Sequence, residues 1–227
     1  MIGIIGALDA EVKDLTNLLE DKKEKVISGL TFYYGKIYDK EVVVSKCGMG
    51  KVFAAVCAEA MILNFDIEEI VHIGIAGSLD DELNIRDVAI ADIVVQHDID
   101  TTALGEPVGY IFDLKRVEIP CAKRIVEKLA DSAKKLNIKY KVGVIASGDQ
   151  FIADEEQKKR IVKNFSAIAC EMEGASTGQV CFMNNVDFGV VRAFSDAGSE
   201  GAGKTYFEEK FKASDVAVEI IKEYLKC

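Results

Sequence analysis

Carboxylates recur where apolar segments of this sequence end. Glu171 and Glu173 are separated by one residue, and Asp196 follows closely on the apolar run Phe188–Val191. Glu11 comes shortly after the first apolar segment of the chain. Open α/β sheets bind their ligands at the carboxyl ends of their strands. Carboxylates collected there indicate acid/base chemistry on a small polar ligand.

Two short glycine motifs follow apolar strands, and neither defines a site alone. Gly48–Lys51 opens a helix and could present backbone amides to an anion, but it lacks the upstream Gly and the Ser or Thr of a Walker A loop. A strand-to-helix turn is the favoured interpretation. Gly74–Ser78 permits a flat ligand to approach the backbone, or is simply a tight turn.

The pair His97-Asp98 does not indicate a metal site. The chain has two histidines in all, and no second group of ligands stands near this one in the sequence. We therefore expect the His97–Asp100 segment to be structural or interfacial, with no metal and no cofactor. A Ser/His/Asp or papain-like Cys/His arrangement is not evident either, so covalent catalysis is not favoured.

Composition narrows the class of protein. The 227 residues carry a formal net charge of −10, which disfavours a nucleic-acid or anionic-membrane partner. The six cysteines form no C-x-x-C pair and are expected to be reduced core residues plus an exposed thiol at Cys227. The first apolar run lacks a positively charged leader, and no stretch reaches the roughly 20 apolar residues of a membrane span. We expect a cytoplasmic protein.

Strand and helix patterns alternate along the chain. This alternation predicts an α/β fold, a single domain over residues 1–227 with a central mixed β-sheet flanked by helices. Several strands are apolar throughout, as expected where both faces are covered. The predicted strands are Ile2–Gly6, Thr31–Tyr38, Glu41–Lys46, Glu69–Ile75, Val88–Val95, Tyr140–Ser147 and Asp187–Phe194.

Three helices are predicted from apolar spacing and from Pro120. The first has one apolar face formed by Val52, Val56, Ala60 and Leu63. Pro120 suits the first turn of the second, which runs to about Leu136. The last is expected to bury Phe207, Phe211, Val218, Ile221 and Leu225. Just before it, the glycine-rich stretch 198–203 is either a mobile lid over a ligand or a surface loop.

Single residues at the predicted strand ends have two possible roles each. Phe151, after the strand that ends at Ser147, is either a core anchor or a platform for a planar base. Glu171 and Glu173, taken alone, are typical of a solvated helix N-terminus. The combination of motifs carries more information than any one of them.

In combination these motifs resemble the 5′-methylthioadenosine/S-adenosylhomocysteine nucleosidases of the purine nucleoside phosphorylase-like superfamily. The resemblance runs through essentially the whole chain, in the family's order and spacing. The segments that carry it are Gly3–Val12, Gly48–Val52, Gly74–Gly77, His97–Asp100, Ser147–Ile152, Glu171–Glu173 and Arg192–Asp196.

The resemblance implies cleavage of the N-glycosidic bond of an adenosine thioether, releasing adenine and a thio-sugar. Asp196 is then the general acid to the base, and Glu11 orients and deprotonates the attacking water. As a glycosidic bond breaks, positive charge develops on the sugar and negative charge on the base. A carboxylate beside the sugar and a protonated acid beside the base would stabilise these charges. The same resemblance implies that Phe151 and Ile152 bind adenine and that Met172 and Glu173 bind the ribose. Arg192 and Ser195 would support the carboxylates. The other implied pocket residues are Ala76, Gly77 and Phe207.

The family pattern also implies a homodimer, with the segment after His97 lending apolar residues to the partner's pocket. Two positions depart from that pattern and bear on the 5′ substituent. Ile75 stands in the turn where the family commonly has Ser, and Leu104 stands where an aromatic residue is usual.

Several alternatives remain at this point. A nucleosidase for futalosine derivatives or a phosphorylase would share the fold, and a nucleoside-binding sensor would share it without catalysis. Asp9, Ala10 and Glu11 place negative charge where related phosphorylases bind phosphate, which favours water as nucleophile. The joint presence of Glu11, Glu173 and Asp196 favours an enzyme over a sensor.

Overall fold

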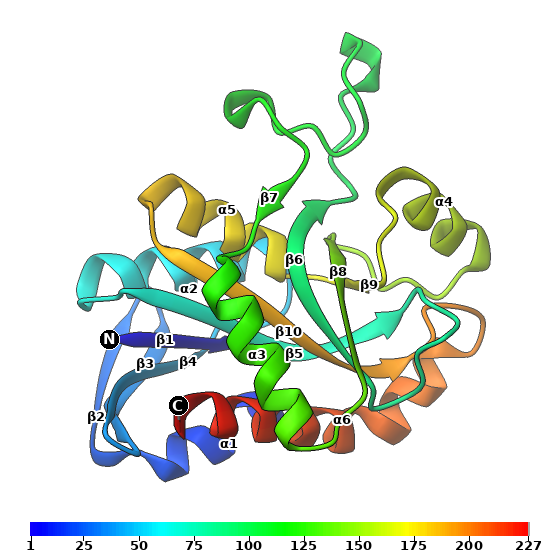
Figure 1. Ribbon diagram of the computed structural model, residues 1–227. Helices are drawn as coiled ribbons and strands as arrows, with labels where there is room; N and C mark the ends of the chain where they lie inside the picture. Colours follow the sequence, from blue (N-terminus) through cyan, green and yellow to red (C-terminus); the bar gives the residue numbers. More distant parts are fainter. Residues whose placement is uncertain (227) are drawn as a thin grey trace.

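A computed structural model describes residues 1–226 as layers of helix on both faces of one ten-stranded mixed sheet (Figure 1). All seven predicted strands are present, and the α/β prediction is confirmed. The strands are β1 (Ile2–Gly6), β2 (Glu20–Ile27), β3 (Leu30–Ile37), β4 (Lys40–Lys46), β5 (Glu69–Ser78), β6 (Val88–Gln96), β7 (Ile119–Pro120), β8 (Tyr140–Ser147), β9 (Ala169–Glu171) and β10 (Asp187–Asp196).

Strand β5 is the centre of the sheet. It pairs in parallel with β1 on one side and with β10 on the other. Where β1 ends, the three-residue strand β9 pairs antiparallel with Gly77 and Ser78 of β5. Because β10 also pairs with β6, β6 with β8 and β8 with β9, these strands close into a ring. The closure brings the carboxyl ends of β5, β9 and β10 together.

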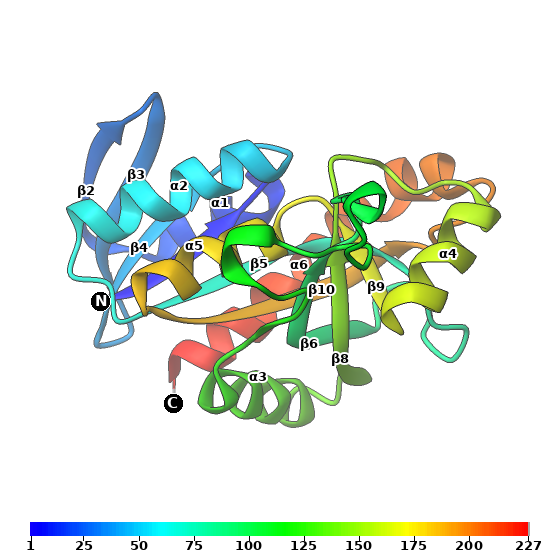
Figure 2. The same cartoon turned by 90° about the horizontal axis from the view of Figure 1, so that it is seen from above.

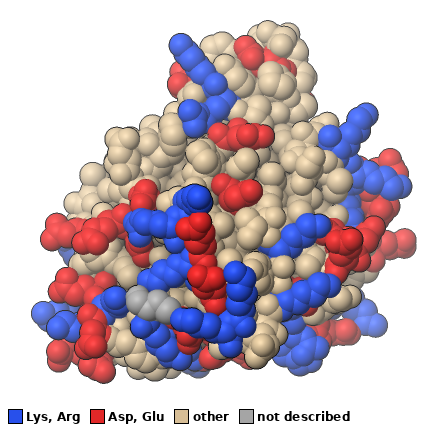
Figure 3. Space-filling model, viewed as in Figure 1, with Lys and Arg blue, Asp and Glu red and all other residues tan. Residues whose placement is uncertain are grey.

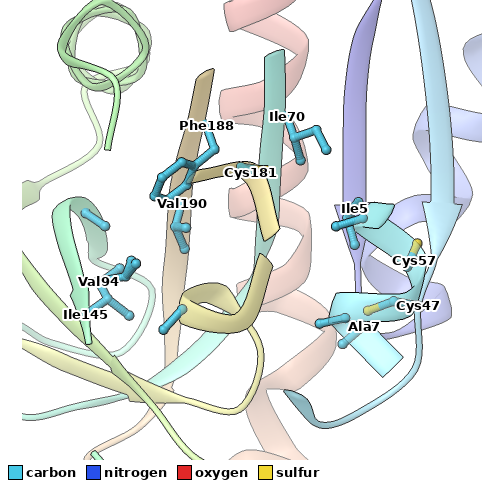
Figure 4. Packing of buried hydrophobic residues seen from close by; sticks show 14 of the residues in the cluster. Ile5, Ala7, Cys47, Cys57, Ile70, Val94, Ile145, Cys181, Phe188 and Val190 are labelled. Carbon is cyan, nitrogen blue, oxygen red and sulfur yellow. The ribbon is translucent and has the colours of Figure 1, made fainter. Parts of the chain in front are cut away.

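Helices cover the two faces of the sheet in separate sets (Figure 2). On one face, α2 (Lys51–Asn64) and α5 (Gly174–Asn184) pack over a core that includes Ile5, Cys57, Cys181 and Phe188 (Figure 4). On the other face, three helices bury residues in a second core. These helices are α1 (Asp9–Leu18), α3 (Lys123–Lys135) and α6 (Ala202–Lys226). Helix α4 (Glu155–Phe165) adds Ile161 to a smaller third core.

Residues 97–118 leave the sheet between β6 and β7 and extend away from the body of the molecule (Figure 1). We call this segment the excursion. It holds two short 3-10 helices, η1 (Thr102–Leu104) and η2 (Phe112–Leu114), and both Leu104 and Phe112 are exposed.

Two predictions about helices are wrong in part. Pro120 lies in β7, and α3 begins at Lys123. The helix predicted over Val52–Leu63 is α2, and its apolar face is exposed at Val52 and Leu63, by 73% and 70%. In α6, Val218, Ile221 and Leu225 are buried, whereas Phe207 and Phe211 are exposed.

Cys47, Cys57, Cys170 and Cys181 are buried and Cys121 is half-buried, all with free thiols. Cys227, predicted as an exposed thiol, lies outside the described residues. Within residues 1–226, no helix has the length and apolar character needed to cross a membrane.

Candidate active site

The carboxyl ends of β1, β5, β9 and β10 open into one cavity of about 590 Å³, open mouth included. Nine of the predicted site residues line it, and no Lys or Arg is found among the described lining residues. The cavity is lined by Ala7, Leu8, Glu11, Met49, Ile75, Ala76, Gly77, Gln150, Phe151, Ile152, Cys170, Glu171, Met172, Glu173, Ser195, Asp196 and Tyr206.

Glu11 is held in the first turn of α1 by backbone amides. The N–H groups of Ala7 and Leu8 donate to its Oε2 at 2.6 and 2.8 Å, and the N–H of Ile75 donates to its Oε1 at 3.1 Å. Its side chain is buried, and this burial raises the pKa of Glu11 despite the opposing charge of Arg192 and the three amides. A buried carboxylate of raised pKa is suited to accept a proton near neutral pH.

Gly74 leaves the space that Glu11 occupies. A Cβ at position 74 would lie 2.8 Å from Glu11 Oε1 and 3.4 Å from Arg192 Nη1. Carbon and oxygen cannot approach so closely without displacement, so any side chain at position 74 would move the Glu11 carboxylate from the position it takes beside β5.

Asp196 ends β10 on the opposite wall. Its Oδ1 accepts the Gly198 N–H at 2.9 Å, and its Oδ2 accepts the Ser195 hydroxyl at 2.8 Å. Burial raises the pKa of Asp196, although these two hydrogen bonds favour the ionised form. An acid of raised pKa holds its proton at higher pH than an exposed Asp and can donate it to a ligand.

Glu173 lies at the N-cap position of α5. Its Oε1 accepts the Gly50 N–H, at the start of α2, at 2.7 Å. Burial raises the pKa of Glu173, and the neighbouring Glu171 raises it further, while Arg192 opposes both. Three carboxylates from α1, α5 and β10 therefore face one cavity, and each is held mainly by neutral donors.

Arg192 lies below the cavity floor and is 1% exposed. Its Nη2 forms an ion pair with Glu171 Oε2 at 2.5 Å, and its Nη1 donates to the His72 carbonyl at 3.0 Å. Glu171 also accepts the Ser147 hydroxyl and the amide of Gly174. Burial lowers the pKa of Arg192, but the carboxylates of Glu171, Glu173 and Glu11 raise it above its ordinary value. A fixed positive charge thus lies beneath the acids.

Comparison with known proteins identifies the family. The model of the phosphorylase superfamily matches residues 1–226. A 5′-methylthioadenosine/S-adenosylhomocysteine nucleosidase of Staphylococcus aureus is 39% identical over 229 residues, covering 99% of this chain and all of the relative. The chain belongs to this nucleosidase family of the phosphorylase superfamily. It is accordingly an enzyme of the N-glycosidic hydrolase class.

Solved structures of family members superpose closely on this one. A Neisseria meningitidis nucleosidase in complex with methylthio-immucillin-A has a TM-score of 0.96 at 29% identity, covering 99% of this chain and 98% of the other. A mutant Helicobacter pylori nucleosidase with 5′-methylthioadenosine in the active site has a TM-score of 0.95 at 34% identity, covering 99% and 97%. A structure described as futalosine hydrolase of H. pylori gives the same four values.

In this nucleosidase family member, two aromatic rings stand at the cavity edge. Phe151 is 47% exposed, and its ring meets that of Tyr206 edge-on, with centroids 5.5 Å apart. Phe207, expected in the pocket, is not among the lining residues and is 70% exposed. Helix geometry explains the difference, because adjacent residues of α6 point in directions about 100° apart and Tyr206 takes the inward one.

Sequence reasoning gave no separate role to Glu171, Cys170, Gln150 or Tyr206. The signal for Glu171 was present in its spacing from Glu173, but which acid would pair with Arg192 depends on β9, a strand of three residues. Tyr206 is adjacent to the predicted Phe207, and the sequence alone does not show which of these two aromatic residues faces the cavity.

The pair His97-Asp98 lies at the start of the excursion. Among residues 1–226 there is no group of three or more His, Cys, Asp or Glu side chains placed to hold a metal ion. Asp98 instead forms an ion pair with Lys51, whose Nζ lies 2.6 Å from Asp98 Oδ1.

Proposed function

We propose that the protein hydrolyses the N-glycosidic bond of 5′-methylthioadenosine and S-adenosylhomocysteine, releasing adenine and a 5-thio-ribose sugar. The observation that carries this proposal is the placement of Glu11, Glu173 and Asp196 around one cavity, with no Lys or Arg among the lining residues of the described chain. The S. aureus and H. pylori relatives named above support the choice of substrate.

Asp196 serves as the general acid. Protonation of adenine N7 by its carboxyl group would make the base a better leaving group, because negative charge develops there as the bond breaks. The raised pKa of Asp196 supports this role, since the proton must be present before bond cleavage. The Ser195 hydroxyl and the Gly198 amide fix the orientation of the carboxyl group.

Glu11 activates the attacking water on the sugar side of the bond. Three backbone amides aim its carboxylate from two elements, so little rearrangement is needed during the reaction. Glu173 would hold the ribose hydroxyls beside Met172, and its negative charge would favour the positive charge that develops on the sugar.

Phe151 and Ile152 form the adenine end of the site. The half-exposed ring of Phe151 offers one face to a planar base, and the backbone of Ile152 would bond the edge of that base. Ala76 and Gly77 allow the base to lie close to β5 because their side chains occupy little space. In this proposal Tyr206 closes the edge that Phe207 was expected to cover.

Water suits this site better than phosphate does. A phosphate nucleophile would need positive side chains or free amides, whereas the described cavity lining offers no Lys or Arg and the amides near Glu11 already bind its carboxylate. Hydrolysis is therefore favoured over phosphorolysis.

A second candidate substrate is a futalosine derivative that carries adenine. The observation in its favour is the H. pylori structure described as futalosine hydrolase, which is as similar to this chain as the nucleosidase structure from the same organism. The same acids would perform the reaction, and the difference would lie in the 5′ substituent.

The test is adenine release by purified protein from methylthioadenosine, S-adenosylhomocysteine, adenosine and 6-amino-deoxyfutalosine, each with and without phosphate. We expect phosphate-independent release from the two thioethers, and its loss in Asp196→Asn. Release from 6-amino-deoxyfutalosine alone would replace the proposed substrate, and a phosphate requirement would replace the proposed reaction.

We further propose that two copies of the chain form a homodimer. Exposed apolar side chains gather on α2 and α5 at Val52, Phe53, Val56, Leu63 and Met183. In Figure 3 charged side chains crowd the lower part of the molecule and are more scattered above it, where uncharged surface lies between them. An apolar surface of this kind is typical of a protein interface. Light scattering should give twice the mass of the chain, and a monomeric mass would refute the dimer.

The proposed location is the cytoplasm. The five cysteines in the described part of the chain are all free. Free thiols in a protein of this size fit a reducing compartment.

A further inference from the structure

Asp98 lies where three segments meet, at the foot of the excursion. It follows β6 directly, and its side chain is only 15% exposed. Nothing in the proposed reaction uses it, since it does not line the cavity. A carboxylate that is mostly buried needs strong partners to stay charged, so its contacts indicate what it does.

The two oxygens of Asp98 bind two different segments. Oδ1 accepts Lys51 Nζ at 2.6 Å, at the start of α2. Oδ2 accepts the Asp149 N–H at 2.9 Å, in the loop 148–152. The backbone N–H of Lys51 in turn donates to Asp149 Oδ1 at 2.8 Å, which closes a ring of hydrogen bonds. The start of α2 and the loop 148–152 are therefore fixed relative to each other through Asp98.

Both of these segments reach the cavity. Gly50, next to Lys51, donates its N–H to Glu173 Oε1 at 2.7 Å. The loop 148–152 carries Phe151 and Ile152. A Cβ at Gly50 would lie 2.9 Å from Asp149 Oδ1, so the two segments are also in close contact directly.

We propose that Asp98 is a positioning residue, which holds the Gly50 amide against Glu173 and the loop 148–152 at the adenine end of the site. This proposal rests on the proposed function, because that function identifies the ligand that Glu173 and Phe151 would contact. Asp98 itself touches no substrate and acts through Lys51 and Asp149.

The variant Asp98→Asn separates charge from shape. A carboxylate can accept from Lys51 and from the Asp149 amide together, but an Asn side chain offers one oxygen and one NH2 group in the same place. One of the two donors must then face the NH2 group, so one contact of the ring is lost. Lys51→Met removes the same ion pair from the other side and serves as the second variant.

A pH profile distinguishes positioning from a general loss of stability. The Gly50 N–H favours the ionised form of Glu173, so its displacement should raise the pKa of Glu173. The other groups that act on Glu173 are Glu171 from β9, Arg192 from β10 and Glu11 from α1, and none of these bonds Asp98. The acid limb of kcat/KM should consequently move to higher pH in both variants.

The control is Asp100→Asn, in the same segment. Asp100 is exposed. Within the described chain, its carboxylate accepts hydrogen bonds from the N–H and the hydroxyl of Thr102. Adenine release from methylthioadenosine is measured between pH 5 and 9 for wild type, the three single variants and the double variant of Asp98 and Lys51. Adenine affinity is measured by calorimetry, together with the melting temperature.

We expect kcat/KM to fall roughly 10- to 100-fold in Asp98→Asn and Lys51→Met, as for the loss of one charge-assisted hydrogen bond, with Asp100→Asn unchanged. A double variant should lose less than the two single losses added together, because the two side chains share one ion pair, although Lys51 also donates to Gln96 and Asp98 also accepts from Asp149. An unmoved acid limb with an unchanged adenine affinity would overturn the proposal, whatever the melting temperature. Adenine binding needs no turnover, so it tests Asp98 even if the thioethers prove not to be substrates.

Discussion

Strands β5 and β10 lie side by side in parallel, and acidic residues stand at both ends of this pair of strands. At their amino ends Glu69 pairs with Asp187 in register, and at their carboxyl ends Asp196 pairs with Gly77 beside the cavity. The two ends are about 30 Å apart at the usual rise of a strand. Similar side chains thus stand in two environments of one sheet.

At the amino ends the carboxylates are neutralised. Arg124 binds Glu69 and Asp187 together, and the Tyr224 hydroxyl donates to Glu69 Oε1 at 2.6 Å. Burial lowers the pKa of Arg124, but its two carboxylate partners raise it above its ordinary value. This cluster joins β5, β10, α3 and α6, so its role is to hold the fold together.

At the carboxyl ends the carboxylates bind mainly neutral N–H and O–H donors. Burial then raises the pKa values of Glu11, Glu173 and Asp196, which makes proton transfer possible near neutral pH. The nature of the partner, rather than the acid itself, therefore decides whether a buried carboxylate stabilises the protein or reacts.

The largest difference should be between substitutions of the two aspartates at opposite ends of β10. Asp196→Asn should lose roughly 10²- to 10⁴-fold in the rate of adenine release, because Asn cannot donate a proton to the base. Asp187→Asn, at the other end of the same strand, should leave that rate within about twofold. Steady-state kinetics on methylthioadenosine measures both. Comparable losses in the two variants would remove the distinction between the ends.

Glu11→Gln should lose roughly 10²-fold or more, because an amide cannot take the proton of the attacking water. Adenine should still bind, since Glu11 lies on the sugar side of the site. Asp9→Asn is the matched control, as Asp9 lies in the same helical turn and its side chain is 82% exposed. Full turnover in Glu11→Gln would assign water activation to another group.

The amino-end cluster should affect stability and not activity. Glu69→Leu leaves the buried Tyr224 hydroxyl without its acceptor and should lower the free energy of unfolding by about 1–3 kcal/mol. Adenine release per folded molecule should not change. Glu68→Leu, whose side chain is 85% exposed, should change the unfolding free energy by less than about 0.5 kcal/mol in urea titrations. A loss of activity in folded Glu69→Leu would mean that the two ends are coupled.

The smallest effect concerns the dependence of stability on pH. Because the pKa of Glu173 is higher in the folded than in the unfolded protein, the folded state binds more protons between the two values. The free energy of unfolding therefore falls as pH rises from the ordinary Glu range through the folded pKa. Glu173→Gln should remove this contribution, about 1.4 kcal/mol for each pH unit between the two pKa values, and flatten the profile measured between pH 5 and 9. An unchanged slope would contradict the raised pKa.

Apolar strands were the most predictable part of the fold. Ile2–Gly6 and Tyr140–Ser147 begin and end where the β-branched runs predicted, because a strand covered on both faces needs an apolar residue at nearly every position. The edge strand β2 was missed. Its sequence from Glu20 is rich in charge, and only its backbone pairing with β3 makes it a strand.

Apolar spacing predicted helices but not what their faces contact. Val52, Leu63 and Phe211 have the periodicity of buried residues and are exposed in the single chain. Periodicity shows that one face of a helix is apolar. It does not show whether that face contacts the core or another subunit, because both give the same pattern. The proposed dimer would account for the exposed face of α2.

The acids of the site could be recognised from their positions at strand ends and from the family pattern. Which acid pairs with Arg192 could not be recognised, because Glu171 and Glu173 lie only two residues apart in sequence. Glu171 ends β9 and Glu173 precedes α5, and this difference in local structure separates their directions. The choice between Tyr206 and Phe207 depended in the same way on the starting point of α6.

Gly74 also limits how this gene can change. Every amino acid reached from a glycine codon by a single base change carries a Cβ, and each would press on the Glu11 carboxylate. A substitution at position 74 would therefore act on the reaction through Glu11, by displacing its carboxylate. The wall that Glu11 forms in the cavity therefore depends on a residue that does not itself line the cavity.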